Sequence, residues 1–125
     1  MSVRYQLGIG ILLGLLLVTY VQSNRIVSAA ALLQEFGTYN ANDRICFYKQ
    51  FLKSSSSPVL VSFSNPTLKA INYIRVEQVQ QNIGGIAAEI IRGAIGTSTV
   101  TVQISTINGK SHFVSDVRIQ MMCTA

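Results

Sequence analysis

Three side chains near the C-terminus have the types that a serine hydrolase would use: Ser111, His112 and Asp116. A catalytic triad needs a histidine that is hydrogen-bonded both to the nucleophile and to an orienting carboxylate. If this segment is one extended strand, His112 and Asp116 lie about 13 Å apart along one face, at about 3.3 Å per residue. That separation excludes a direct hydrogen bond. We therefore expect no triad and interpret His112 as a surface residue.

The other reactive side chains do not predict a catalytic, cofactor or metal site. The chain has one histidine and two cysteines, Cys46 and Cys123, whereas a zinc site normally takes three or four protein ligands. The carboxylates lack the paired spacing of a glycosidase, and the glycine pairs lack the Lys-Ser or Lys-Thr of a phosphate-binding loop. The carboxylates are Glu35, Asp43, Glu77, Glu89 and Asp116. We expect a non-enzymatic protein without a cofactor, in which Gly84, Gly85, Gly93 and Gly96 are turn residues.

The two cysteines are candidates for a disulfide, because an even count suggests pairing in an oxidising compartment. A bridge between Cys46 and Cys123 would close a loop of about 78 residues and contribute about 4 kcal/mol in the chain-entropy model. It would connect the first strand expected after residue 42 to the last. The alternative is two unpaired, buried thiols.

The first 23 residues are organised like a secretory signal peptide. Arg4 supplies a positive charge, residues 7–18 contain no polar side chain, and a branched Val21 and a small Ser23 take the −3 and −1 positions of a cleavage site. The apolar run is short for a transmembrane helix, which needs about 20 apolar residues. We therefore expect cleavage between Ser23 and Asn24 and a secreted, extracellular protein. A cut near residues 28–30 and an uncleaved anchor are the alternatives.

Cleavage would leave a mildly basic mature chain, residues 24–125, without a stable membrane anchor. Loss of Arg4 lowers the formal net charge from +5 to +4. The remaining cations are scattered singly along the sequence, whereas nucleic-acid-binding proteins usually gather them in a patch or stripe. We therefore interpret the charge as a solvated surface and do not expect nucleic acid as the partner.

From residue 44 onward, short β-rich runs alternate with turn residues. Six strands are expected, at residues 44–51, 59–63, 70–77, 86–91, 100–104 and 113–121. Asn108-Gly109 predicts a tight type I′ hairpin between the last two, because both residues tolerate positive φ. Before the strands, residues 26–36 could form a short helix or an extended arm. No long helix separates the strands, which favours an antiparallel sheet architecture.

We therefore predict an all-β, single-domain protein with an antiparallel sandwich or barrel-like fold. The expected organisation is a signal peptide at 1–23, an arm or short helix at 24–41 and a β domain at 42–125. Alternation places two sets of side chains on core faces. They are Val100, Val102 and Ile104, and Phe113, Val117, Ile119 and Met121. Apolar side chains on both faces of the segment 87–91 should be buried on both sides, and an exposed face would suit self-association or an apolar ligand. They are Ala87, Ala88, Ile90 and Ile91.

Several short segments resemble one known family in their order and spacing. The resemblance spans about residues 42–120, with Asn42-Asp43-Arg44-Ile45, Ile71-Asn72-Tyr73-Ile74-Arg75-Val76, Gly84-Gly85-Ile86-Ala87, Thr99-Val100-Thr101-Val102-Gln103-Ile104 and Gly109 through Phe113. These resemble segments of the insect family labelled "transcription activator, multiprotein bridging factor 2-like", many of whose members are described as secreted salivary or haemolymph peptides. Residues 92–96 depart from its Gly-Gly-Pro-Gly-like loop. Residues 119–121 depart from its Ile-Tyr-Gly-like ending, so a tyrosine-dependent contact there is not transferred.

The resemblance implies a compact, usually exported β domain without established catalytic residues. Our leading hypothesis is a secreted salivary or haemolymph protein that binds an extracellular protein, for example through an exposed strand edge. A second is a carrier of a small apolar ligand, which needs a cavity on the order of several hundred Å³. A third is the transcription coactivator of the family label. An exported leader, a disulfide and the lack of a basic run argue against this third function.

Overall fold

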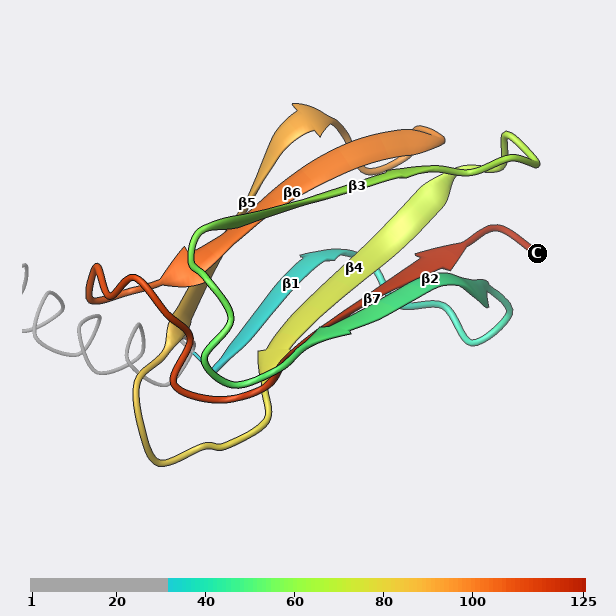
Figure 1. The fold of residues 1–125 in the computed structure, drawn as a ribbon. Helices are drawn as coiled ribbons and strands as arrows, with labels where there is room; N and C mark the ends of the chain where they lie inside the picture. Colours follow the sequence, from blue (N-terminus) through green and yellow to red (C-terminus); the bar gives the residue numbers. More distant parts are fainter. Residues whose placement is uncertain (1–31) are drawn as a thin grey trace, which may run out of the picture. The chain divides into compact units, whose positions relative to one another are not determined.

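The computed structural model describes residues 32–125, which form seven β-strands and no α-helix (Figure 1). The strands are β1 (Leu33–Gly37), β2 (Arg44–Phe51), β3 (Val59–Ser64), β4 (Ile71–Gln78), β5 (Ile86–Gly93), β6 (Thr99–Thr106) and β7 (Val117–Cys123). Within this described range, no helix is long and apolar enough to cross a membrane. The expected signal peptide and its cleavage site between Ser23 and Asn24 lie outside the described residues.

The strands form two antiparallel sheets that pack face to face. One sheet has the order β1-β4-β7-β2 and the other has the order β3-β6-β5. Figure 1 shows the three-stranded sheet above the four-stranded one. The prediction of an all-β antiparallel sandwich is therefore confirmed.

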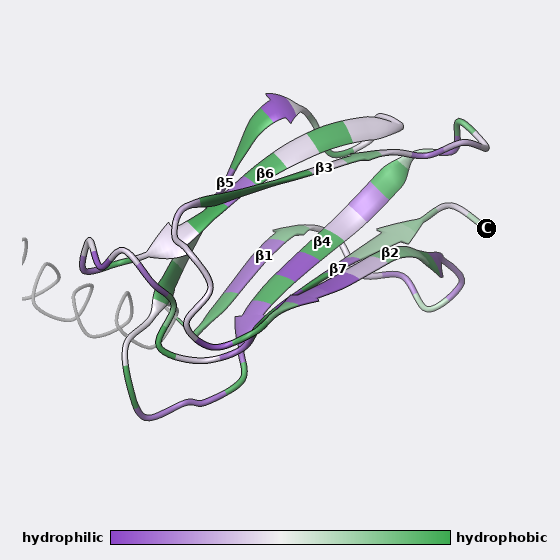
Figure 2. Cartoon of the chain, in the orientation of Figure 1, coloured by the Kyte–Doolittle hydropathy of each residue, from purple (hydrophilic) through white to green (hydrophobic). Residues whose placement is uncertain are grey.

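The core lies between the sheets and is built from alternate side chains of the central strands. On β6, Val100, Val102 and Ile104 are fully buried, and on β7 Val117, Ile119 and Met121 are fully buried, as predicted. Phe113, in the loop before β7, is only 2% exposed. Figure 2 shows the corresponding alternation of hydrophobic and hydrophilic residues along β4. Burying each of these aliphatic side chains contributes about 1.5–3 kcal/mol, which makes the core the main source of stability.

The predicted hairpin between the last two strands is wrong. β6 and β7 belong to different sheets, and only Gly109 of the Asn108-Gly109 pair has positive φ. The segment before β7 hydrogen-bonds to the β2–β3 loop instead of to β6. The amide of Phe113 donates to the Ser55 carbonyl (2.9 Å) and the amide of Ser54 donates to the Phe113 carbonyl (2.9 Å). These long-range hydrogen bonds fix the segment between β6 and β7, where the chain passes from one sheet to the other.

Two other expectations need correction. The segment 24–41 was expected to be an arm or short helix, but its described part contains β1, which pairs with β4 from Leu33 to Gly37. The β domain therefore begins before residue 42. Residues 87–91 are not buried on both sides, because β5 is an edge strand and Ile91 is 41% exposed.

Candidate binding surface

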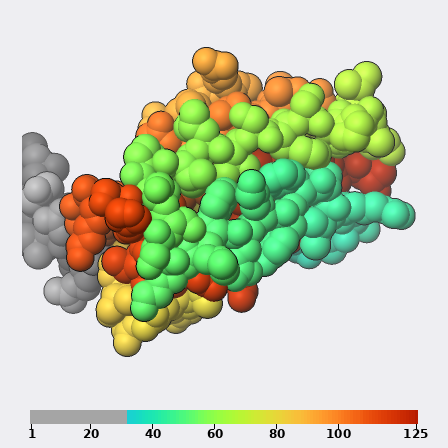
Figure 3. Space-filling view, in the orientation of Figure 1, coloured from blue at the N-terminus to red at the C-terminus, as the bar shows by residue number. Residues whose placement is uncertain are grey.

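One side of the sandwich is bordered by the edge strands β2 and β3, one from each sheet. The rings of Phe47 on β2 and Phe63 on β3 lie 5.0 Å apart between centroids, so the two strands meet through aromatic side chains. Figure 3 shows the atoms of β2 (teal) and β3 (green) side by side on one face of the described domain. Most of the lysine and arginine side chains of the described residues lie on this side.

The side of β2 that faces the other sheet alternates basic and aromatic residues. In the β2–β7 register, Arg44 pairs with Cys123, Phe47 with Met121, Lys49 with Ile119 and Phe51 with Val117. All four β7 partners are buried core residues, and cross-strand partners share a face. Arg44, Phe47, Lys49 and Phe51 therefore point toward the β3 side.

A β-bulge at Cys46 makes this pattern possible. The register shifts between Ile45 and Phe47, so that Cys46 is the extra residue. Without the shift, Arg44 would fall on the opposite face of the strand from Phe47, because side chains alternate with a period of two. The bulge thus places Arg44 in the same row as the residues that follow it.

Lys49 occupies a core-facing position but keeps its charge in water. Its register partner, Ile119, is fully buried, whereas Lys49 itself is exposed. Its Nζ lies 5.2 Å from the centroid of the Phe51 ring, within range of a cation–π interaction. The ammonium group thus lies over the ring of the half-buried Phe51, while the lysine side chain stays exposed to water.

Open clefts with further cations lie at both ends of β2. At the start of the strand, a cleft of about 520 Å³ is lined by Arg44, Lys69 and the ring of Phe63. Past the end of the strand, a cleft of about 630 Å³ is lined by Lys53, Lys110, His112, Ile83 and Phe113. Both clefts are open to solvent and are lined by cationic and apolar side chains together.

We use the name basic seam for the surface along β2 that carries Arg44, Lys49, Lys53, Lys69 and Lys110. It contains five of the eight Lys and Arg residues in the described range. The other three, Arg75, Arg92 and Arg118, lie on β4, β5 and β7. The cations that are scattered singly in the sequence are therefore gathered by the fold.

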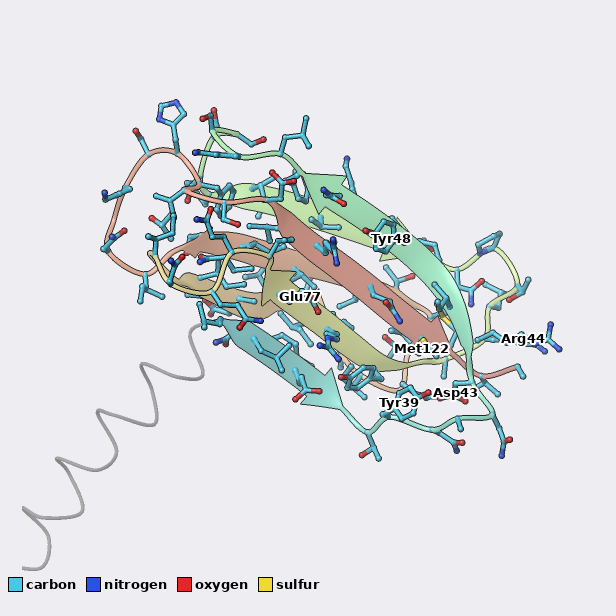
Figure 4. All side chains as sticks on the ribbon, turned by 90° about the horizontal axis from the view of Figure 1, so that it is seen from below. Tyr39, Asp43, Arg44, Tyr48, Glu77 and Met122 are labelled. Carbon is cyan, nitrogen blue, oxygen red and sulfur yellow. A yellow bond between two sulfur atoms is a disulfide. The ribbon has the colours of Figure 1, made fainter. Side chains whose placement is uncertain are left out.

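Most carboxylates lie away from the basic seam. Glu77 faces outward on β4 (Figure 4), where it pairs with Arg75 at 2.8 Å and with Arg118 at 3.7 Å. Asp43 directly precedes Arg44 and is the exception, and its carboxylate accepts a hydrogen bond from Asn72 Nδ2 at 3.2 Å. Glu35 lies on β1 and Glu89 lies on β5. The acidic side chains thus leave the β2 side with a positive excess.

Two other acceptors approach the seam, the carboxylate of Asp116 and the backbone carbonyl oxygen of Ala125. Asp116 accepts hydrogen bonds from Gln50 Nε2 (3.0 Å) and from the amide of Lys53 (2.7 Å). Lys69 Nζ donates to the backbone carbonyl oxygen of Ala125 at 2.7 Å. Arg44, Lys49 and Lys110 make no ion pair with any described residue.

On the β1–β4 side, by contrast with the seam, a carboxylate is held by a hydrogen bond from Tyr73. Its hydroxyl donates a hydrogen bond to Glu35, and its ring packs edge-on against Tyr39 at 5.7 Å between centroids. Burial raises the pKa of Tyr73 above its usual value of 10.0, and the hydrogen bond and the charge of Glu35 raise it further. The phenol therefore stays a hydrogen-bond donor throughout the neutral range.

The residues that resemble a triad do not form one in the described structure. Ser111, His112 and Asp116 lie in the loop before β7 and not on one strand, so the strand-based distance does not apply. Ser111 Oγ is 3.0 Å from His112 Nδ1. No hydrogen bond joins His112 to Asp116, whose carboxylate is bonded to Gln50 and to the Lys53 amide. The orienting carboxylate of a triad is therefore not in place.

The two cysteines are joined, as expected from their number. Cys46 and Cys123 form a disulfide with Cα atoms 5.7 Å apart and a sequence separation of 77. Cys46 is the bulge residue of β2, and Cys123 ends the neighbouring strand β7. Within residues 32–125, no group of three or more His, Cys, Asp or Glu side chains is arranged to hold a metal ion.

Sequence reasoning did not identify the basic seam. A local signal was present, because Phe47, Lys49, Phe51 and Lys53 alternate with a period of two. Lysine on the apolar face of a strand is a known feature of edge strands. The contributions of Lys69 and Lys110 depend on long-range pairing and have no local signal.

The chain was also compared with known proteins. No curated protein gives a significant match. A family model described as "Transcription activator MBF2" matches residues 36–120, which run from β1 into β7 and include most of the β-sandwich. The motifs that resemble this family in the sequence lie within the matched range. The chain belongs to the transcription activator MBF2 family.

Proposed function

We propose that this protein is secreted and acts, without catalysis, by binding another protein outside the cell. The observation that carries the proposal is the Cys46–Cys123 disulfide, which uses both cysteines of the chain. Disulfides form and persist in oxidising compartments and are rare in the cytosol and nucleus. The signal-peptide pattern of residues 1–23 supports the same compartment.

The hydrogen bonds and ion pairs that hold the carboxylates favour binding over catalysis. Asp43, Glu77 and Asp116 are each held by hydrogen bonds or ion pairs on separate elements. Glu35 accepts the hydrogen bond of Tyr73. No cleft brings a nucleophile, a base and an orienting carboxylate together among the described residues. The exposed edge strands and the basic seam are suited to protein recognition instead.

Transcription activation is the second candidate, because the family description names it. It requires that the chain stay inside cells, where its disulfide would be reduced. Carriage of a small apolar ligand receives less support. Both clefts beside β2 are open and bordered by lysines, and the space between the sheets is filled by Ile, Val, Phe and Met side chains.

The test is the intact mass of the protein recovered from the medium of expressing insect cells, before and after reduction and alkylation. We expect a chain that begins at Asn24 and takes up two alkyl groups only after reduction. The variant in which Cys46 and Cys123 are both alanine is the control, since it takes up none. A full-length chain found only inside cells, with both thiols free, would overturn the proposal and favour the activator.

A further inference from the structure

We propose that the basic seam binds an extended acidic segment of a partner protein, which adds as a strand to the open edge of β2. This inference rests on the proposed function, because it names the surface and the chemical class of partner for a protein-binding domain. It follows from three properties of β2 and its surroundings: an open backbone edge, an alternating row of side chains and a positive excess.

The backbone edge supplies the first part of the interaction. β2 pairs with β7 on one side, and no other described strand pairs with its second side. An edge strand presents alternating N–H and C=O groups that can pair with a strand from another chain. Added strands gain their affinity from these main-chain hydrogen bonds and their specificity from alternate side chains.

The row of side chains on β2 sets the sequence pattern of the partner. Directly opposed residues in neighbouring strands have Cβ atoms about 5 Å apart, close enough for charge pairing. Acidic residues would therefore lie opposite Arg44 and Lys49, and apolar residues would lie opposite Phe47 and Phe51. Lys53 lies in the turn two residues after β2. A second acidic residue, four positions from the one opposite Lys49 and about 13 Å away along an extended partner, would lie near that turn.

The two clefts extend the same chemistry beyond the ends of β2. Each is lined in part by apolar side chains, Phe63 in one and Phe113 and Ile83 in the other. Lys69 and Lys110 add a cation to the respective rims. An acidic segment longer than β2 could therefore place an apolar side chain and a carboxylate at each end.

A second copy of this chain is a poor occupant. Antiparallel pairing of two β2 strands about Lys49 would set lysine against lysine, and like charges directly opposite each other are destabilising. Lysine facing inward on an edge strand is one way in which proteins prevent such self-pairing. At these positions the lysines would attract an acidic strand, whereas they would repel the lysines of a second copy.

A nucleic acid or an anionic membrane would also be attracted by five cations. Neither can pair with the backbone edge of β2, and neither supplies an apolar side chain at each position opposite Phe47 and Phe51. The pattern of half-buried rings between exposed cations therefore favours a polypeptide, and the other two polyanions are outcomes of the test.

The experiment uses the mature protein and a capped nine-residue peptide, Glu-Thr-Val-Thr-Glu-Thr-Val-Thr-Glu, followed by NMR amide shifts and fluorescence anisotropy. We expect saturable binding with shifts concentrated in β2 and its flanking loops. The double variant Lys49→Glu/Lys53→Glu should lose affinity by about tenfold, since each reversal turns an attraction into a repulsion. The matched control Arg92→Glu, on β5 of the other sheet, should bind like the parent.

A peptide with Lys in place of each Glu gives the reciprocal test, and it should bind the double variant more tightly than the parent protein. If the double variant does not fold, Lys53→Glu/Lys110→Glu replaces it, because both side chains lie in loops around one cleft. Absence of peptide binding, or equal binding by the charge-reversed variant, would overturn the inference. Tighter binding of a single-stranded oligonucleotide or of phosphatidylserine vesicles, lost in the same variant, would also overturn it. Because the protein is purified, these outcomes are independent of whether cells export it.

Discussion

Replacing Cys46 and Cys123 by alanine should lower the free energy of unfolding substantially while leaving the sandwich able to fold. The bridge spans 77 positions of the sequence. In the chain-entropy model, a closed loop of that length destabilises the unfolded state by about 4 to 5 kcal/mol. Cys123 is only 2% exposed, so alanine is preferred to serine, which would bury a hydroxyl group there.

The contacts that remain should hold the fold together in this variant. β2 keeps its register with β7 from Phe47 to Phe51, and the core between the sheets does not depend on the sulfur atoms. A small domain has a total stability of about 5–15 kcal/mol, so the loss amounts to a large share of it. We therefore expect a folded protein with a strongly reduced urea midpoint.

Urea unfolding followed by circular dichroism measures this effect. Four samples are compared: the parent protein and the double alanine variant, each with and without a reductant. The reduced parent and the variant should share one midpoint, and the variant should not respond to reductant. A loss below about 1 kcal/mol would refute the reasoning, because the loop closed by the bridge would then not constrain the unfolded chain.

Three further predictions concern single residues. Tyr73→Phe should cost about 1 kcal/mol of stability at neutral pH. Because burial and its carboxylate partner raise the pKa of Tyr73, the parent protein should lose this stability as pH rises from about 10 through the raised pKa. In urea unfolding between pH 7 and 11, Tyr73→Phe should lack this alkaline loss and the exposed control Tyr48→Phe should keep it. Gly93→Ala should lower the thermal midpoint far more than Gly96→Ala, because a Cβ at Gly93 would lie 2.1 Å from the Thr99 carbonyl oxygen and a Cβ at Gly96 meets nothing within 4 Å; equal effects would contradict this. Ile119→Ala should cost about 2–5 kcal/mol and Ile119→Val about 0.5–1.5 kcal/mol in urea unfolding, since the side chain is fully buried, and a similar cost for both would argue against a packed core.

Much of the sheet structure could be predicted from the sequence, because its signals are local. Residues 44–51 form β2 with the expected bounds, since a β-rich run there is followed directly by a serine-rich loop. β6 likewise has the expected core face, set by simple alternation. Patterns of this kind need no knowledge of which strands are neighbours.

The errors occur where pairing partners decide the structure. Leu33–Gly37 follows an alanine-rich stretch that favours a helix, yet it forms β1 because β4 offers it a pairing edge. Asn108-Gly109 is a strong local hairpin signal, but residues 111–113 instead hydrogen-bond to the β2–β3 loop. In both places long-range hydrogen bonds outweigh local preference.

The basic seam could be predicted only in part for the same reason. Alternating cations and aromatic residues on β2 are visible in the sequence, whereas the approach of Lys69 and Lys110 is not. Counting cations along the chain indicated a dispersed charge. The distribution in space is different because β2 lies at the edge of its sheet with basic loops at both of its ends.

The disulfide and the basic seam share β2, and this connects the compartment of the protein to its proposed binding. An edge strand has one neighbour and is therefore among the elements that open most readily. Cys46 lies within the seam, and its bond to Cys123 ties β2 covalently to the central strand β7. A partner strand gains most from an edge that is already ordered, because less conformational entropy is lost on binding. In an oxidising compartment the disulfide would keep β2 ordered before the partner binds. In a reducing compartment β2 would open more readily, and binding would cost more conformational entropy. The proposed secretion and the proposed binding therefore both involve the Cys46–Cys123 bond.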